Sequence, residues 1–111
     1  MSNRKHPRYE VDAYVDFTGR EVLLYHGIRN ISLGGICIET PTVEPIGTLV
    51  DVLVSFPELG NEMALKGEVV WANVQPPQDV GIRWIEMTDQ QRDQLRDYFE
   101  KVNARLIPDG D

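Results

Sequence analysis

The chain has 111 residues, a length that supports one compact domain and excludes a second domain with its own core. Hydrophobic residues make up 41% and charged residues 26% of the sequence, which excludes disordered, collagen-like and coiled-coil classes. The formal net charge of −7 disfavours nonspecific binding to nucleic acid or anionic lipid.

The charge is unevenly distributed. The first nine residues contain Arg4, Lys5 and Arg8 and no acid, whereas the rest of the chain holds eight basic residues against eighteen acidic ones. Cys37 has no second cysteine to pair with, and we expect it to be a small buried side chain. The longest nearly continuous apolar run, residues 49–56, is too short to span a bilayer. Without a recognisable secretory segment, a cytoplasmic protein that is not inserted in a membrane is expected.

The chain begins with an amphipathic strand pattern. Over residues 9–17, every second position is apolar: Tyr9, Val11, Ala13, Val15 and Phe17. A period of two predicts a strand with one buried face. A turn at residues 18–20 then leads into a second predicted strand over residues 21–29, so the two form a hairpin.

Four further strands are predicted after a turn. Residues 30–35 form a turn-rich segment whose paired glycines permit positive φ. Beyond it, residue types that favour strands predict strands over residues 36–40, 47–56, 63–73 and 80–86.

A helix is expected over residues 88–107. Thr88 and Gln91 have the spacing of a capping box, and Asp89 adds a favourable acid in the first turn. One apolar stripe is formed by Leu95, Phe99, Val102 and Leu106. The simpler interpretation packs this stripe on the strands; the alternative is that it binds a partner helix.

These elements predict an all-β fold, a six-stranded antiparallel barrel with a C-terminal helix. A single domain over residues 1–111 would consist of three parts, a basic leader (1–8), the barrel (9–87) and the helix (88–107). Closure would hide the edges that an open sheet leaves exposed. Because side chains fill so small a barrel, a ligand must bind outside it or at its rim.

The sequence contains no pattern for catalysis or metal binding. His6 and His26 are the only two histidines, and neither lies at metal-ligand spacing from a cysteine or an acid. Asp12 and Asp16 share a strand face, which is ordinary surface for an acidic protein. We therefore predict that the chain is not an enzyme and needs no metal or cofactor.

Two segments carry complementary chemistry. Arg4 and Arg8 supply guanidinium groups, which pair bidentately with phosphate or with the O6/N7 edge of guanine. Asn30 and Ser32 lie in a turn whose side chains and glycine-exposed amides can bond a base edge or a phosphate. Each segment alone is an ordinary tail or turn, but together they suit a guanine nucleotide.

These residues resemble the two motifs of the PilZ domains, bacterial receptors for the second messenger cyclic di-GMP. Arg4 and Arg8 match the family's Arg-x-x-x-Arg motif, and Asn30, Ser32 and Gly35 match Asp/Asn-x-Ser-x-x-Gly. The resemblance covers nearly the whole chain, with further similar segments at residues 8–17, 36–39, 67–71 and 81–84. The family fold, a six-stranded antiparallel barrel with a C-terminal helix, agrees with the strand count above.

The resemblance also implies residue roles. Arg4 and Arg8 would bind the phosphates and guanine edges of cyclic di-GMP, Asn30 and Ser32 would contact a guanine or a phosphate, and Gly35 would let the backbone approach. Secondary contacts are expected from Lys5, His6, Gly34 and Arg83.

Two positions depart from the family pattern. Asn30 stands where Asp is commoner, and without the carboxylate's charge and second acceptor it should bind guanine N–H donors less strongly. Asn3 precedes the first motif, where some members have another Arg associated with an intercalated ligand dimer, so one ligand molecule per domain is expected.

The implied function is a cyclic di-GMP-binding receptor or adaptor that changes conformation on binding and signals to a separate, unidentified effector protein. Motility and biofilm formation are the processes expected. The leader would be mobile when free and would be ordered over the barrel by the ligand's phosphates. One alternative is a ligand-free adaptor of the same fold in a pilus or motility complex. The other, a barrel that binds single-stranded nucleic acid, is disfavoured by the acidic body.

Overall fold

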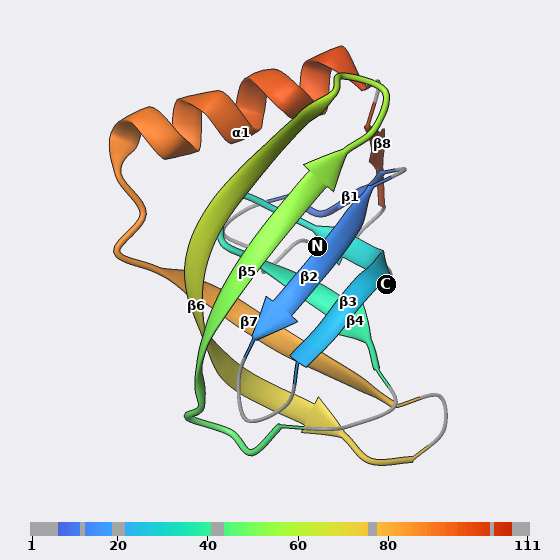
Figure 1. Cartoon of the computed structure of the whole chain (residues 1–111), viewed down its shortest axis with the longest axis vertical. Coiled ribbons are helices and arrows are strands. Elements are labelled where there is room, and N and C mark those ends of the chain that lie inside the picture. The colour runs from blue at the N-terminus through green and yellow to red at the C-terminus, as the bar shows by residue number, and fades with distance from the viewer. Residues whose placement is uncertain are drawn as a thin grey trace.

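The computed structural model describes residues 7–11, 13–18, 22–40, 44–75, 78–102 and 104–107. This part of the chain is mostly β, with one C-terminal helix (Figure 1). Helix α1 spans Asp89–Lys101. The strands are β1 (Tyr9–Glu10), β2 (Tyr14–Thr18), β3 (Val22–Ile31), β4 (Gly35–Glu39), β5 (Leu49–Phe56), β6 (Asn61–Asn73), β7 (Asp79–Ile85) and β8 (Arg105–Leu106).

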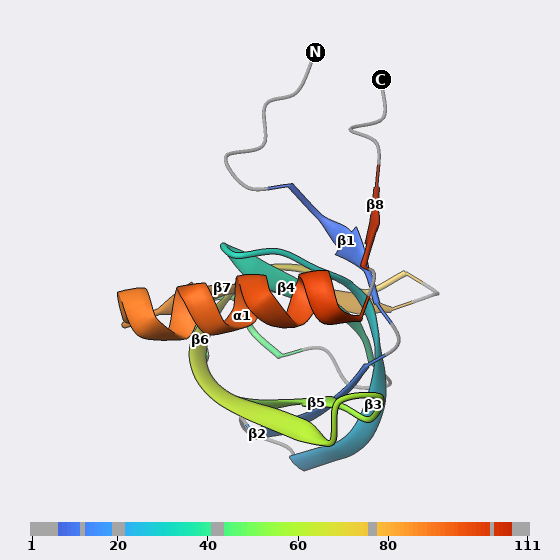
Figure 2. The same cartoon turned by 90° about the horizontal axis from the view of Figure 1, so that it is seen from above.

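All eight strands belong to one antiparallel sheet. Their order is β2-β5-β6-β7-β4-β3-β1-β8, and β2 pairs with β3 as well as with β5. Each of the strands β2 to β7 therefore has a neighbour on both sides, while β1 and β8 extend the sheet beyond β3. The sheet curves and α1 lies across it (Figure 2). The prediction of a six-stranded antiparallel barrel with a C-terminal helix is confirmed in part. The strands are antiparallel and the helix follows them, but the sheet has eight strands.

The first predicted strand, residues 9–17, is divided into β1 and β2. Strand β1 lies between β3 and β8, whereas β2 lies between β3 and β5. Val11 and Ala13 connect them and are buried, although neither belongs to a strand. The alternation correctly predicts that Val11, Ala13 and Val15 are buried. It does not reveal the change of neighbouring strand, which depends on distant parts of the chain.

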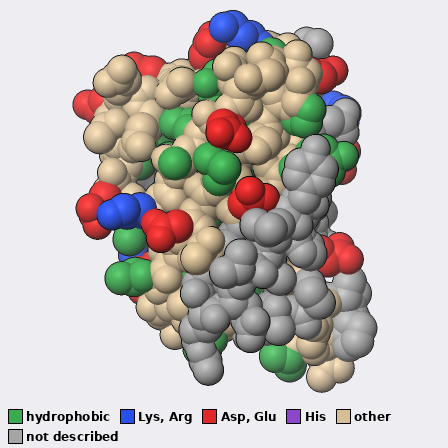
Figure 3. Space-filling model, viewed as in Figure 1, with side chains coloured by type: hydrophobic (Ala, Val, Ile, Leu, Met, Phe, Trp, Pro, Cys, Tyr) green, Lys and Arg blue, Asp and Glu red, His purple; other side chains and the backbone are tan. Residues whose placement is uncertain are grey.

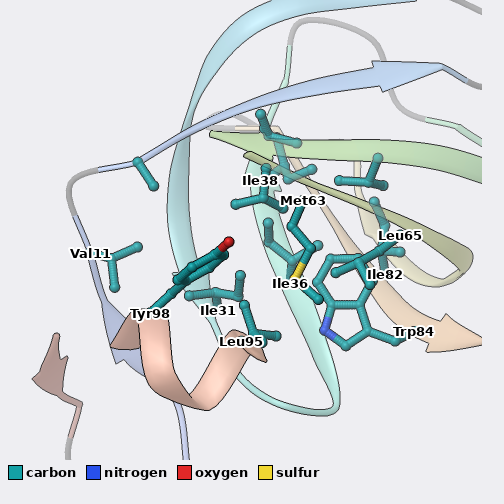
Figure 4. Packing of buried hydrophobic residues seen from close by; sticks show 14 of the residues in the cluster. Val11, Ile31, Ile36, Ile38, Met63, Leu65, Ile82, Trp84, Leu95 and Tyr98 are labelled. Carbon is teal, nitrogen blue, oxygen red and sulfur yellow. The ribbon is translucent and has the colours of Figure 1, made fainter. Parts of the chain in front are cut away.

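The core lies between the sheet and α1. Strand β5 alternates in burial, because Val50, Val52, Val54 and Phe56 are buried in turn. The ring of Phe56 lies 5.0 Å from the ring of Tyr98 in α1, measured between centroids. Figure 4 shows α1 directing apolar side chains into this cluster. Burial of each such side chain contributes about 1.5–3 kcal/mol to stability.

Helix α1 begins as predicted. The Thr88 Oγ1 accepts a hydrogen bond from the backbone N–H of Gln91 at 3.1 Å, and the Gln91 Oε1 accepts one from the backbone N–H of Thr88 at 2.9 Å. Both bonds of the capping box are therefore present.

An ion pair lies in the last turn of the helix. The Asp97 carboxylate lies 3.0 Å from Lys101 Nζ, and its hydrogen bond raises the pKa of Lys101 above the ordinary lysine value.

The predicted end of the helix at residue 107 is wrong. The helix ends at Lys101, and Leu106, expected on the buried stripe, lies in β8 with 62% of its surface exposed. The backbone N–H of Ile107 donates to the carbonyl oxygen of Arg8 at 2.9 Å. After the helix, the chain therefore pairs with the N-terminal segment.

Two further properties concern Cys37 and membrane insertion. Cys37 is buried in β4, as predicted. In the part of the chain that the structure describes, no helix has the length and apolar character needed to cross a membrane.

Candidate functional site

The second arginine of the first motif contacts the first residue of the second motif. Arg8 Nη1 donates a hydrogen bond to Asn30 Oδ1 at 2.6 Å, across 22 positions of sequence. Asn30 is held near the end of β3, and the backbone carbonyl of Arg8 is held by Ile107. The fold therefore places Arg8 of the first motif against Asn30 of the second.

Ser32 organises the turn between β3 and β4. Its Oγ accepts hydrogen bonds from the backbone N–H groups of Gly34 and Gly35, at 3.0 and 3.1 Å. The indole N–H of Trp84 donates to the carbonyl oxygen of Ser32 at 3.1 Å. The hydroxyl and the two amides are thus engaged with one another, and Ser32, which is buried, holds the shape of the turn.

Gly35 is required by close packing between strands. A Cβ atom at this position would overlap the carbonyl oxygen of Ile82 in β7. The expectation of positive φ is wrong for this turn, because among the described glycines only Gly47 and Gly60 have it. The strand pairing of Gly35 with Arg83 keeps the backbone extended and leaves no room for a side chain.

A hollow of about 270 Å³ opens beside this turn. Among the described residues, its charged lining side chains are Arg8 and Arg83, and none is acidic. The lining residues are Arg8, Ser32, Gly34, Gly35, Ile36, Val70, Trp71, Gly81, Ile82 and Arg83. The result is a basic hollow with a glycine-rich wall.

Trp71 is the main residue of this hollow that the sequence did not predict. The register between β6 and β7 shifts between Val69 and Trp71. Val69 is fully buried, whereas Val70 is 41% and Trp71 37% exposed. A Cβ atom on Gly81 would overlap the Trp71 indole, so the ring lies over that glycine. Strict alternation would have placed Trp71 inside with Val69; the glycine opposite it was the available signal.

The structure describes some of the remaining predicted site residues but not others. Gly34 and Arg83, expected as secondary contacts, both line the hollow. Asn30 contacts Arg8 without lining the hollow itself. Arg4, Lys5 and His6 lie outside the described residues, as does Asn3. Among the described residues no group of three or more His, Cys, Asp or Glu side chains could hold a metal ion.

Comparison with known families identifies the chain. The model of the PilZ domain matches residues 2–101, and the chain belongs to the PilZ family. The resemblance found in the sequence is therefore confirmed. PilZ domains are non-catalytic receptor domains, and the family binds cyclic di-GMP.

Solved structures share this fold at low sequence identity. The inhibitor of motility MotI/DgrA from Bacillus subtilis matches with a TM-score of 0.72 and 17% identity, covering 91% of this chain. This chain spans about half of that protein, 51% of its length. The PilZ domain of YcgR from Escherichia coli, solved with cyclic di-GMP, matches with a TM-score of 0.74 and 14% identity over 92% of each chain.

A third structure is the PilZ domain of CeSA from a cellulose-synthesizing bacterium. It matches with a TM-score of 0.66 and 15% identity, covering 86% of this chain and 97% of the other. No curated protein matches the sequence.

Proposed function

We propose that this PilZ domain is a cytoplasmic receptor that binds cyclic di-GMP in the hollow between Arg8 and Arg83. The observation that carries the proposal is the 2.6 Å contact between Arg8 and Asn30, because it joins both motifs beside one basic hollow. Family membership supports the same ligand.

The side chains around the hollow suit the parts of a guanine dinucleotide. Arg8 uses one donor on Asn30 and keeps four more for phosphate oxygens or the O6/N7 edge of guanine. The exposed indole face of Trp71 offers a surface on which a base can stack. Gly34 and Gly35 admit the ligand close to the backbone. Phosphate, base edge and base face would then each have a partner.

The small size of the hollow supports a role for the leader. Pockets that enclose a drug-sized ligand measure about 300–1,000 Å³, and this hollow measures about 270 Å³. A dinucleotide would therefore protrude, and Arg4, four residues before Arg8, would bind the exposed part. Ordering each leader residue costs about 1–2 kcal/mol, whereas each charge-assisted hydrogen bond contributes about 1.5–3 kcal/mol. Several arginine contacts are needed to offset the cost.

On binding the ligand, the domain would change the surface that it presents to other proteins and would catalyse no reaction. When the leader lies over the sheet, the surface available to a separate effector protein changes. That effector would act in motility, biofilm formation or a related process. The likeness to an inhibitor of motility supports this direction. One ligand molecule per domain is part of the proposal.

Calorimetric titration tests the proposal. The protein is titrated with cyclic di-GMP, GMP, cyclic di-AMP and a short single-stranded oligonucleotide. Saturable binding of cyclic di-GMP alone, at one molecule per chain, is the expected result. Absence of binding to all four would favour a ligand-free adaptor, and binding of the oligonucleotide would favour a nucleic-acid-binding role; either would overturn the proposal.

A further inference from the structure

Arg83 stands in a cross-strand row between a glycine and a carboxylate. In the register of the sheet, Gly35 of β4 pairs with Arg83 of β7, and Arg83 pairs with Glu68 of β6. The Arg83 Nη2 lies 2.7 Å from the Glu68 Oε1, within hydrogen-bond distance. Arg83 lines the basic hollow, and Glu68 does not.

We infer that Glu68 is a positioning residue, which fixes the guanidinium of Arg83 at the hollow so that this arginine recognises a guanine base. The inference rests on the proposed cyclic di-GMP site and deepens it. Neither motif of the sequence contains Glu68, and its partner Arg83 is only a secondary contact by sequence.

The geometry leaves the ligand-facing side of Arg83 available. Glu68 and Gly35 flank Arg83 from opposite strands, so the carboxylate holds the guanidinium from the side away from the glycine-rich turn. One of five N–H donors is used on Glu68, and the others can bond a ligand. A ligand entering between Arg8 and Gly35 therefore meets an arginine without having to displace its partner.

Fixing this side chain matters because it is otherwise exposed. The side chain of Arg83 is 60% exposed and that of Glu68 is 32% exposed. A long exposed arginine loses rotamer freedom when it binds a ligand, and a neighbour that already restrains it reduces that loss. Glu68 would thus increase affinity through Arg83, although its own negative charge adds nothing favourable toward phosphate.

A fixed guanidinium also distinguishes guanine from adenine. Guanine presents two acceptors, O6 and N7, on the edge that arginine binds, whereas adenine presents N7 together with an amino donor. A guanidinium held in place cannot turn away from that amino group. Glu68 should therefore contribute to discrimination between cyclic di-GMP and cyclic di-AMP as well as to affinity.

A double-mutant cycle measured by calorimetry tests the inference. Glu68→Ala, Arg83→Ala and the double variant are titrated with cyclic di-GMP and with cyclic di-AMP. We expect about tenfold weaker cyclic di-GMP binding for Arg83→Ala and about fourfold weaker binding for Glu68→Ala, with no further loss in the double variant. Glu68→Ala should also lower the preference for cyclic di-GMP over cyclic di-AMP by about fourfold.

Two variants complete the design. Glu68→Gln keeps a carbonyl acceptor and should restore part of the affinity lost in Glu68→Ala. Asp93→Ala removes a comparable exposed ion pair, Asp93 with Arg96 at 3.0 Å on α1, and should leave binding unchanged. Thermal unfolding shows that each variant is folded before it is titrated.

Each contrary outcome has a distinct meaning. Tighter binding by Glu68→Ala would show that the carboxylate competes with the ligand and would overturn the inference. An equal loss from Glu68→Ala with or without Arg83 would show that Glu68 does not act through Arg83, which also overturns it. If the unaltered protein bound no cyclic di-GMP, the proposed function would fail and this inference with it.

Discussion

The basic hollow beside the β3–β4 turn and the acidic groove across β2, β5 and β6 differ in both size and charge. The groove measures about 500 Å³ and is lined by Asp16, Asp51 and Glu86 with one basic residue, Lys66. The hollow measures about 270 Å³, and the described residues that line it include two arginines and no acid. In Figure 3, acidic side chains lie among hydrophobic ones over the visible face, and basic side chains appear near its edges.

The proposed site stands out by the charge of its lining and not by its volume. A ligand with two phosphates is repelled by three carboxylates and attracted by two guanidinium groups. The overall charge of −7 therefore conceals a local reversal of sign. Binding of cyclic di-GMP should therefore depend on the charges around the hollow and not on the net charge of the chain.

Replacing Arg8 by alanine should have the largest effect. The change removes a guanidinium from the hollow and leaves Asn30 without its 2.6 Å partner. We expect cyclic di-GMP to bind at least tenfold more weakly, about 1.4 kcal/mol, as measured by calorimetry. Arg96→Ala, which removes an exposed arginine from α1, is the matched control and should bind normally. An unchanged dissociation constant for Arg8→Ala would contradict the site.

Replacing Trp71 by alanine should have the next largest effect. Stacking of a base on an aromatic side chain contributes about 1–3 kcal/mol, so a loss of at least about fivefold in affinity is expected. Tyr14→Ala is a suitable control, because Tyr14 is 39% exposed against 37% for Trp71 but lies on β2, outside the hollow. Equal effects of the two changes would argue against stacking at Trp71.

The motif residues could be predicted from the sequence, whereas Trp71 could not. Local patterns identified the capping box at Thr88 and the buried positions Val11, Ala13 and Val15, since both depend on neighbours in sequence. The exposure of Trp71 depends on a register shift against β7. The strand that replaces the predicted last turns of the helix pairs with β1 and with Arg8 just before it. Such features arise between distant segments and leave little local signal.

The same limit applies within the candidate site. The two motifs predicted Arg8, Asn30, Ser32 and Gly35 as site residues, but they did not predict what each residue contacts in the fold. Gly35 was expected to permit positive φ, whereas it lies too close to the backbone of Ile82 for any side chain. Glu68 has no motif at all, and its relevance follows only from the row that places it beside Arg83.

Replacing Asn30 by aspartate should tighten binding moderately. Asn30 has one carbonyl oxygen, which already accepts from Arg8, whereas a carboxylate would offer a second acceptor to guanine N–H donors. Hydrogen bonds to charged groups exceed neutral ones by about 1 kcal/mol, and part of this gain is lost to repulsion from the ligand's phosphates. We expect about threefold tighter binding in calorimetry. Weaker binding would mean that Asn30 serves only to hold Arg8.

Neutralising the acidic groove should have the smallest effect. The double variant Asp51→Asn, Glu86→Gln removes two of its carboxylates, and binding of cyclic di-GMP should change by less than about twofold at physiological salt, where charges more than about 8 Å away are screened. A change as large as that of Arg8→Ala would place the ligand on the groove side of the molecule.

The location of bound ligand is the most direct test of the central claim. In a titration of isotopically labelled protein with cyclic di-GMP, backbone amide shifts are followed residue by residue by NMR. The account predicts the largest changes at Arg8, at residues 32–36, at Trp71 and at residues 81–83. Changes centred on Asp16, Asp51 and Glu86, or no saturable change at any residue, would contradict it.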